Sequence, residues 1–242
     1  MILSIYSHKG GTGKTTSTIN LGRALKDRGY DVLLVDLDPQ ANLTYSLGIH
    51  KTDARAVSLS PDNITTTEEG LHILPNLTTP QFLIDYEFPF KTSLRDEMET
   101  CFAEYDFVLI DCPPAMNLTV VNALLASDGV IFPVLLDVLS LEALNQALRA
   151  IKALLSQQQH ELQFTIVLPV MVDSRRLLTS EVKGFIQNTF ETPVFKNHIR
   201  MNVKTAEAPS HGKSVLAYSP NSTGAKDYKK ATDELLQYIN QL

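Results

Sequence analysis

Short runs of apolar residues alternate with amphipathic segments along most of the chain. The apolar runs are rich in Val, Ile and Leu, which is typical of strands buried on both faces of a parallel sheet. Strands are therefore predicted at residues 2–6, 31–36, 71–75, 107–110, 130–135 and 164–171. Between them, apolar residues recur three or four positions apart, as they do along one face of a helix. Helices are predicted at residues 16–28, 93–102, 117–126, 140–155, about 173–190 and 222–242.

The alternation of strands and helices predicts an α/β fold with a doubly wound, mostly parallel sheet flanked by helices. No internal repeat or linker interrupts the pattern, so residues 1–242 are expected to form a single domain. Ser140 is predicted to cap the helix that follows it. The last helix carries Tyr228, Ala231 and Leu235 at helical spacing and is expected to pack against the sheet. Acidic residues weaken its basic face, so no membrane anchor is predicted.

A glycine-rich turn joins the first predicted strand to the first predicted helix. It contains His8, Lys9, Gly10, Gly11, Thr12, Gly13, Lys14, Thr15 and Thr16. A strand, such a turn and a helix form the context of a phosphate-binding loop, in which backbone N–H groups and the helix dipole surround an anion. Lys14 would reach the β- and γ-phosphates of a nucleotide, and the Thr15 hydroxyl would ligate Mg²⁺. A turn with two solvated lysines is the alternative. A dinucleotide fingerprint fits less well, because Thr16 stands where its third glycine belongs.

Carboxylates follow two of the predicted strands. Asp36 and Asp38 come at the end of the strand at residues 31–36, and Asp111 ends the strand at residues 107–110. Parallel strands deliver such residues to the carboxyl edge of the sheet, where α/β folds bind their ligands. Beside a phosphate loop, a carboxylate at this edge can hold Mg²⁺ or orient an attacking water. A helix cap in a solvated turn is the alternative for the first two.

Composition limits the classes of function. The 242 residues include 44% hydrophobic and 20% charged residues, as in ordinary globular proteins. A net charge of −6 argues against a generally basic surface, so any DNA contact needs a local patch. Cys101 and Cys112 have no metal-ligand spacing and suggest no disulfide framework, which indicates a reducing cytoplasm. No apolar stretch is long enough for a transmembrane helix, and no signal peptide is visible.

Together these motifs resemble the deviant Walker A group of P-loop NTPases, the family of ParA and MinD. Lys9 matches the second loop lysine that is the signature of this family. Residues 36–42 are similar to its Asp-x-Asp-Pro-Gln-Gly-Asn motif, with Ala41 in place of Gly. The run Asp111-Cys112-Pro113-Pro114 matches its Walker B pattern. Residues 202–213 are similar to its Asn-Val-Arg-x-x-Glu-Ala-Pro-Ser-His-Gly-Lys segment.

The resemblance implies an ATPase that converts ATP and water to ADP and phosphate, with ATP and Mg²⁺ as cofactors. The implied catalytic residues are Lys9, Lys14 and Asp38. The implied nucleotide-binding residues are Lys9, Gly10, Gly11, Thr12, Gly13, Lys14, Thr15, Thr16 and Asn202. The implied metal-site residues are Thr15, Asp36 and Asp111. In this scheme Lys9 reaches the nucleotide of a partner subunit, Asp38 orients the hydrolytic water, and Asn202 lies near the base.

The resemblance also implies DNA binding without sequence preference. The residues that it points to are Arg175, Arg176, Arg200 and Lys204. Arg175 and Lys204 stand where the family has DNA-binding arginines, and such contacts to phosphate position a protein on DNA without reading its sequence. Arg200 and Met201 replace a Pro-Arg pair of the family, so one cation is lost there unless Arg200 or Lys196 substitutes for it.

The implied function is the positioning or segregation of a plasmid, chromosome or protein cargo. The protein is expected to form a homodimer with ATP, to bind double-stranded DNA in that state, and to be stimulated by a ParB-like partner. It is expected in the cytoplasm, associated with the nucleoid, and without an N-terminal helix-turn-helix domain. Two alternatives stay open, namely a MinD-like membrane-associated positioning ATPase and an ATP-dependent metabolic synthetase of the cobyrinic-acid or dethiobiotin type.

Overall fold

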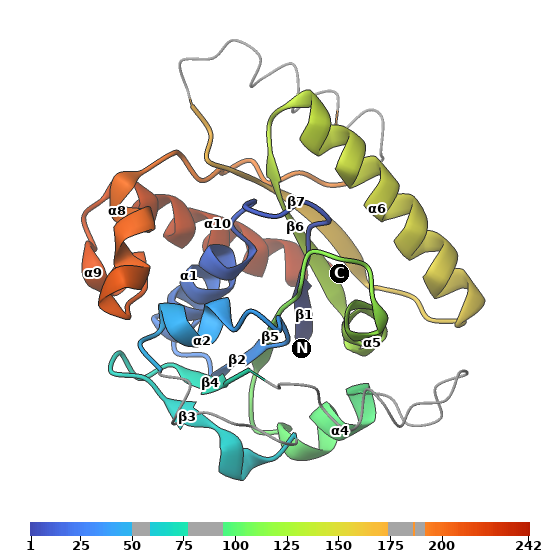
Figure 1. Ribbon diagram of the computed structural model, residues 1–242, viewed down its shortest axis with the longest axis horizontal. Helices are drawn as coiled ribbons and strands as arrows, with labels where there is room; N and C mark the ends of the chain where they lie inside the picture. The colour runs from blue at the N-terminus through green and yellow to red at the C-terminus, as the bar shows by residue number, and fades with distance from the viewer. Residues whose placement is uncertain (50–58, 77–93, 174–185, 187–191) are drawn as a thin grey trace.

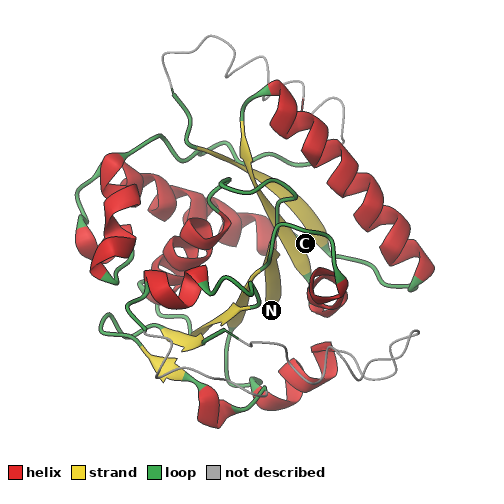
Figure 2. Ribbon diagram, viewed as in Figure 1, coloured by secondary structure: helices red, strands yellow, loops and turns green. Residues whose placement is uncertain are grey.

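A seven-stranded sheet with helices on both faces organises the described part of the chain (Figure 1, Figure 2). The computed structural model describes residues 1–49, 59–76, 94–173, 186 and 192–242. The strands lie in the order β3-β4-β2-β5-β1-β6-β7. All neighbouring strands pair in parallel except β3 and β4, which pair antiparallel. The predicted doubly wound, mostly parallel α/β fold is therefore confirmed.

The strands are shortest at the β3 edge of the sheet. Their bounds are β1 Ile2–Ile5, β2 Val32–Asp36, β3 Thr65–Thr66, β4 His72–Leu74, β5 Phe107–Asp111, β6 Gly129–Leu135 and β7 Phe164–Val170. The inner strands β2, β5 and β1 are buried along their whole length because helices cover both of their faces. The sequence pattern did not predict β3, because two polar threonines at a sheet edge look like part of a loop.

The register of the central strands brings three strand ends together. Asp36, the last residue of β2, lies beside Asp111, the last residue of β5. Asp111 lies in turn beside Ile5, the last residue of β1. Because these strands are parallel, their carboxyl ends meet at one edge of the sheet. Two acidic residues and the glycine-rich turn after β1 therefore emerge side by side.

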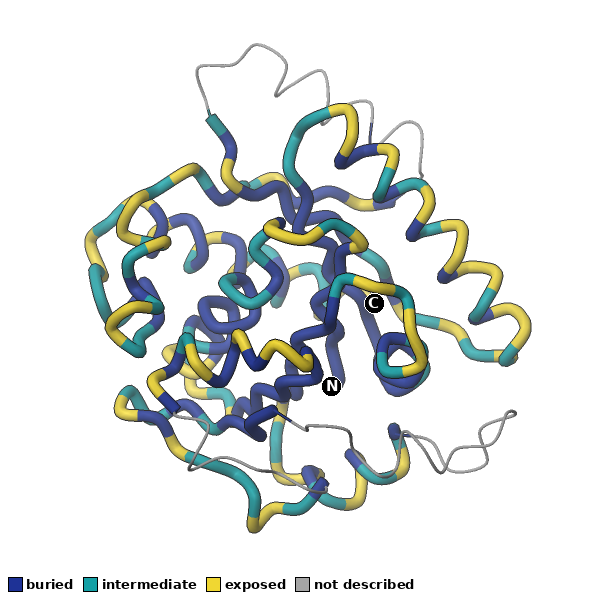
Figure 3. Tube along the Cα trace, viewed as in Figure 1, coloured by how far each residue is buried: buried dark blue, intermediate teal, exposed yellow. Residues whose placement is uncertain are grey.

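Helices enclose an apolar cluster on each face of the sheet. Their bounds are α1 Lys14–Lys26, α2 Asn42–Ser46, α4 Leu94–Cys101, α5 Leu118–Ala126, α6 Val138–Gln157, α8 Val203–Glu207, α9 Val215–Tyr218 and α10 Thr223–Ile239, with 3₁₀ turns at Pro61–Asn63 and Ala208–His211. One cluster lies under α1, α2, α9 and α10, and the other under α4, α5 and α6. Figure 3 shows the buried residues concentrated along the strands. Within the described ranges, no helix combines the length and apolar character needed to cross a membrane.

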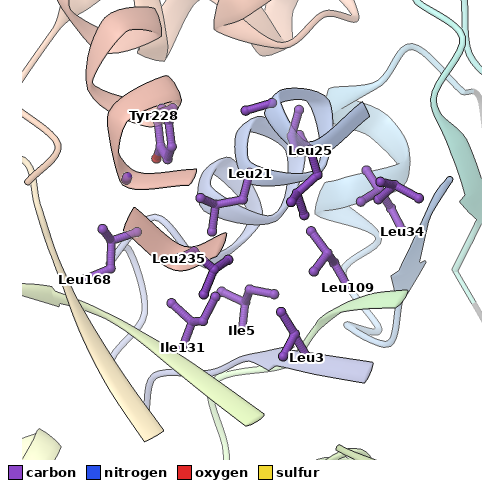
Figure 4. Packing of buried hydrophobic residues seen from close by; sticks show 14 of the residues in the cluster. Leu3, Ile5, Leu21, Leu25, Leu34, Leu109, Ile131, Leu168, Tyr228 and Leu235 are labelled. Atoms are coloured by element: carbon purple, nitrogen blue, oxygen red, sulfur yellow. The ribbon is translucent and has the colours of Figure 1, made fainter. Parts of the chain in front are cut away.

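The C-terminal helix α10 packs against α1 and the sheet. Its residues Tyr228, Ala231 and Leu235 are buried. Figure 4 shows Tyr228 and Leu235 in one apolar cluster with Leu21 and Leu25 of α1. Each large side chain buried in this way contributes roughly 1.5–3 kcal/mol through apolar surface removed from water. The predicted packing of this helix is confirmed.

The predicted start of the long helix α6 is wrong. The helix begins at Val138, and its N-cap is Asp137, whose carboxylate accepts the Ser140 backbone N–H at 2.8 Å. Ser140 lies inside the first turn, and its hydroxyl donates to the same carboxylate at 3.0 Å. The pattern failed because Val138 and Leu139 are apolar yet 70% and 71% exposed, so the buried face of the helix begins later than the helix itself.

The start of β6 has no room for a side chain. A Cβ atom built on Gly129 would lie 2.5 Å from two ring atoms of Phe164, the first residue of β7. Phe164 is buried and packs edge-on against Tyr238, so its ring cannot move aside freely. Gly129→Ala is therefore expected to lower the free energy of unfolding by about 1–3 kcal/mol through overpacking.

Denaturant unfolding followed by circular dichroism measures this loss. In a Phe164→Leu background the smaller side chain leaves space for the added methyl group, so Gly129→Ala should cost less there than in the wild type. A Gly129→Ala variant with the unfolding midpoint of the wild type would contradict the close packing of β6 against β7.

Candidate functional site

The turn between β1 and α1 has the conformation of a phosphate-binding loop. Gly11 and Gly13 have φ angles of 73° and 75°, in the left-handed region that glycine adopts without strain. Gly13 is the N-cap of α1 and has no side chain with which to cap it. The N–H groups of the first helical turn, at the positive end of the helix dipole, therefore remain available to an anion.

Lys14 lies folded over this loop. Its side chain is buried, and Nζ donates to the carbonyl oxygen of Lys9 at 3.4 Å. Burial lowers the pKa of Lys14, while the carboxylates of Asp111 and Asp38 oppose that shift. The ammonium group is thus held between the loop and the acidic edge of the sheet, where it can move from the carbonyl oxygen to a bound phosphate.

Thr15 and Asp111 form a pair suited to a metal ion. The Thr15 hydroxyl donates to Oδ2 of Asp111 at 2.6 Å, and Oδ1 of Asp111 is buried with no hydrogen-bond partner among the described residues. Burial and the neighbouring Asp36 raise the pKa of Asp111 well above its ordinary value. Oxygen donors of this kind fit Mg²⁺, which takes few protein ligands and completes its shell with phosphate and water. The described ranges accordingly contain no group of three or more His, Cys, Asp or Glu able to hold a metal.

Asp38 is held in a tight turn after β2. Its buried carboxylate accepts the Gln40 backbone N–H at 2.9 Å, and its carbonyl oxygen accepts the Ala41 N–H at 2.8 Å. Ala41 has a φ angle of 55°, in the region that favours glycine, which accounts for Gly at this position of the similar family motif. The carboxylate lies close enough to Lys14 to affect its pKa. Asp38 and Lys14 therefore lie at the same edge of the sheet.

Asp36 holds this turn in place. Its Oδ2 accepts the backbone N–H and the hydroxyl of Thr44 at 2.9 and 2.6 Å, and its Oδ1 accepts the Asp38 N–H at 3.1 Å. Burial raises the pKa of Asp36 to about 6. The Thr44 hydroxyl also accepts the Asn76 N–H at 2.9 Å, which ties the turn to the end of β4. The sequence led us to expect that Asp36 supports the metal ion. These hydrogen bonds instead favour a role in which Asp36 positions Asp38.

Lys9 extends from the loop to the first turn of α6. Its Nζ donates to the Ser140 hydroxyl at 3.1 Å and lies 3.6 Å from the Asp137 carboxylate. The side chains of Lys9 and Asp137 are 37% and 44% exposed. An ion pair this open to water contributes at most about 1 kcal/mol, so Lys9 can exchange it for another anion at small cost. Neither partner of Lys9 was predicted from the sequence, although Asp137 is of a residue type preferred at helix N-caps.

An apolar pocket of about 190 Å³ adjoins the loop. Its lining residues are Gly13, Thr16, Val170, Met171, Ile199, Arg200, Met201, Asn202, Thr205, Ala206 and Tyr228. An apolar pocket beside a phosphate-binding turn suits a nucleobase. Asn202, which is expected near the base, lines this pocket and is the N-cap of α8, where its side chain accepts the Thr205 N–H at 3.2 Å.

Two of the four cations expected to bind DNA are described, and both are paired. Arg200 forms a fork-shaped ion pair with Asp227, with Nε–Oδ2 at 2.9 Å and Nη2–Oδ1 at 2.6 Å. Lys204 donates to Glu207 at 2.9 Å and lies 5.7 Å above the Tyr218 ring. The partner of Arg200 could not be predicted from the sequence, because no local pattern connects residues so far apart in the chain. Outside the described residues lie Arg175 and Arg176.

Comparison with known proteins agrees with this geometry. Residues 1–164 match a family model described as an AAA domain. Over 246 aligned residues the chain is 36% identical to the sporulation initiation inhibitor protein Soj of Bacillus subtilis, with 97% of each protein covered. It is 36% identical to the chromosome partitioning protein ParA of Caulobacter vibrioides, over 97% of this chain and 93% of the other.

A solved structure is also similar to this chain. Cobyrinic acid a,c-diamide synthase from Mycobacterium smegmatis, with a bound ATP analogue and magnesium, has a TM-score of 0.81 and 28% identity, over 99% of this chain and 95% of the other. The sequence similarity to the two partition proteins is higher and extends over almost their whole lengths. The chain therefore belongs to the ParA/MinD family of partition ATPases.

Proposed function

We propose that this protein dimerises with ATP, binds DNA without sequence preference in that state, and positions or segregates a plasmid, chromosome or protein cargo with a ParB-like partner. The observation that carries the proposal is the position of Lys9, a second loop lysine held outside the loop on an exposed ion pair. One lysine is enough for a phosphate loop, and Lys14 supplies it. A further lysine on the surface beside the loop is suited to the phosphates of a second subunit.

The residues around the loop have different roles in hydrolysis. Lys14 neutralises the β- and γ-phosphates, while Thr15 and Asp111 supply oxygen ligands. Mg²⁺ bound there would stabilise the negative charge of the transferred phosphoryl group. Asp38 orients the attacking water. The M. smegmatis structure with an ATP analogue and magnesium supports the choice of both cofactors.

Closure of two subunits face to face would bring Lys9 to the nucleotide of the partner. Lys9 would then exchange Asp137 and Ser140, an exposed and weak set of contacts, for the more highly charged triphosphate. Val138 and Leu139 follow Asp137 directly and are 70% and 71% exposed. Exposed apolar residues beside this lysine support a contact surface at the same edge of the molecule.

DNA binding would be completed only in the dimer. The chain has a net charge of −6, so a small cationic patch acts against the charge of the whole protein. Lys204 belongs to the proposed patch with Arg175 and Arg176, whereas Arg200 contributes less because Asp227 already neutralises it. A closed dimer contacts twice as many DNA phosphates, and affinity rises steeply with that number.

A second candidate is an ATP-dependent synthetase that acts on a small carboxylate. The structural similarity to cobyrinic acid a,c-diamide synthase favours it. Residues 202–213, which are similar to the partition ATPases, favour the first candidate. A MinD-like membrane ATPase is less well supported, since Tyr228, Ala231 and Leu235 of α10 are buried against α1 and the sheet.

DNA retention with different nucleotides tests the proposed function. With Mg²⁺ and ATP, the wild-type protein should bind double-stranded DNA of unrelated sequences equally well, and it should lose that binding with ADP or without nucleotide. The affinity should fall steeply between about 50 and about 200 mM salt, because cation–phosphate contacts release counterions. Lys14→Ala is the control, and it should retain no DNA with any nucleotide.

DNA binding that is independent of nucleotide would contradict the proposal. Sedimentation with anionic liposomes in place of DNA would point to a membrane-associated ATPase. Turnover of ATP that requires a small carboxylate would favour the synthetase.

Replacing the Asp38 carboxylate should stop hydrolysis while ATP still binds. Asp38→Asn keeps the side-chain volume and an acceptor for the Gln40 N–H, so the turn should be retained. Loss of water activation should slow phosphate release at least about 100-fold and leave the dimer trapped on DNA. Phosphate release and DNA dissociation are measured in the same samples. Release at the wild-type rate would exclude Asp38 from the chemistry.

A further inference from the structure

The first turns of α10 lie behind one wall of the pocket beside the phosphate loop. That wall is formed by residues 200–206. Three α10 residues contact it, namely Thr223, Gly224 and Asp227. The described lining of the pocket includes none of the three. These three residues can therefore affect a ligand in the pocket only through the position of residues 200–206.

Asp227 holds both the backbone and the side chain of Arg200. Its Oδ2 accepts the Arg200 backbone N–H at 3.1 Å and Nε at 2.9 Å, and its Oδ1 accepts Nη2 at 2.6 Å. Asp227 is only 5% exposed, whereas the Arg200 side chain is 40% exposed, so the carboxylate is sheltered from water while the guanidinium stays partly accessible. Two bonds to one carboxylate fix the orientation of the guanidinium plane, and the third fixes the backbone of Arg200, a residue that lines the pocket.

Thr223 and Gly224 hold the next part of the wall. The Thr223 hydroxyl accepts a hydrogen bond from Nδ2 of Asn202 at 2.6 Å. A Cβ atom on Gly224 would collide with the Thr205 hydroxyl, so glycine lets the wall approach α10 closely. Among the described residues, that hydroxyl is buried without a hydrogen-bond partner. Thr205 is therefore held by packing against Gly224 and has no freedom to move toward the helix.

The same helix reaches the phosphate side of the site. Tyr228, next to Asp227 in sequence, is fully buried, and its hydroxyl lies 3.2 Å from that of Ser17 in the first turns of α1. Helix α1 begins at Lys14 in the phosphate loop. Through these contacts α10 sets the distance between the pocket wall and the loop.

We propose that Asp227 is a positioning residue for recognition of the nucleotide base. It holds the Arg200 guanidinium flat, so that the purine ring of ATP stacks on it, and it does not touch the nucleotide itself. Guanidinium groups stack well on aromatic faces, and a fork-shaped pair with a carboxylate presets their orientation. Met171 and Met201 complete the apolar contact to the base. This role rests on the proposed ATP site and adds to it the means of holding the base.

A comparison of ATP with inorganic triphosphate separates binding of the base from binding of the phosphates. Calorimetry with Mg²⁺ present measures the affinity of the wild type, Asp227→Asn and Asp233→Asn for both ligands. Asp233→Asn is a matched control, because Asp233 is also an α10 aspartate paired with an arginine, Arg28, and lies outside the described pocket lining.

Asp227→Asn should weaken the binding of ATP about tenfold or more and that of triphosphate by less than about twofold. It should also raise KM for ATP more than it lowers kcat, since Asp227 does not touch the reacting phosphate. Asp233→Asn should change neither affinity.

A second set of variants leaves the charges unchanged. Gly224→Ala should weaken ATP binding with the same selectivity, because the added methyl group pushes Thr205 away from α10. Adding Thr205→Ala removes the colliding hydroxyl and should restore the affinity. If the double variant binds ATP as weakly as Gly224→Ala alone, the claim that α10 positions residues 200–206 is wrong.

Two results would overturn the positioning role while leaving the ATP site intact. One is a wild-type preference for ATP over triphosphate that Asp227→Asn retains in full. The other is an equal loss of both ligands in Asp227→Asn, which would assign the residue to general folding. A wild-type protein that binds ATP no better than triphosphate would instead overturn the proposed base site and, with it, the proposed function.

Discussion

The crowding of buried carboxylates at one edge of the sheet is the constraint on which the site depends. Asp36 and Asp111 end neighbouring parallel strands in register, and Asp38 follows in the next turn. Burial removes these groups from water, and they repel one another. Burial therefore raises the pKa of Asp36 to about 6 and that of Asp111 well above its ordinary value. Because β2 and β5 are paired, the carboxylates cannot move apart, and each needs donors or cations close by.

The carboxylates differ in the donors and cations that surround them, and these differences indicate different roles. Donors from the protein satisfy Asp36, so it holds the turn that carries Asp38. Asp111 keeps one oxygen unpaired in the described structure, and that oxygen would be a ligand for Mg²⁺. Lys9 does not pair with any of these three carboxylates in the described structure and forms an exposed ion pair with Asp137. In the proposed function, the buried part of the site binds and hydrolyses the nucleotide, and the exposed lysine contacts the nucleotide of a second subunit.

Local patterns explain what could be predicted from the sequence. The glycine-rich turn, the acidic strand ends and the packing of α10 each depend on residues that are close together in the chain. Contacts between distant residues could not be predicted, and the pair of Arg200 with Asp227 is the clearest example. The hydrogen-bond partners of individual side chains also could not be predicted from the sequence pattern. Asp137 rather than Ser140 caps α6, and Asp36 faces Thr44, because the path of the backbone decides which oxygen meets which N–H group.

The transfer of Lys9 from Asp137 to the nucleotide of a partner is tested most directly by the mass of the protein in solution. Light scattering with Mg²⁺ and ATP should show that the wild type doubles its mass, while Lys9→Ala stays monomeric although it still binds ATP. Asp137→Asn, which removes the partner of Lys9 and keeps the lysine, should dimerise at least as readily as the wild type. A Lys9→Ala variant that dimerises with ATP as the wild type does would contradict the role of Lys9.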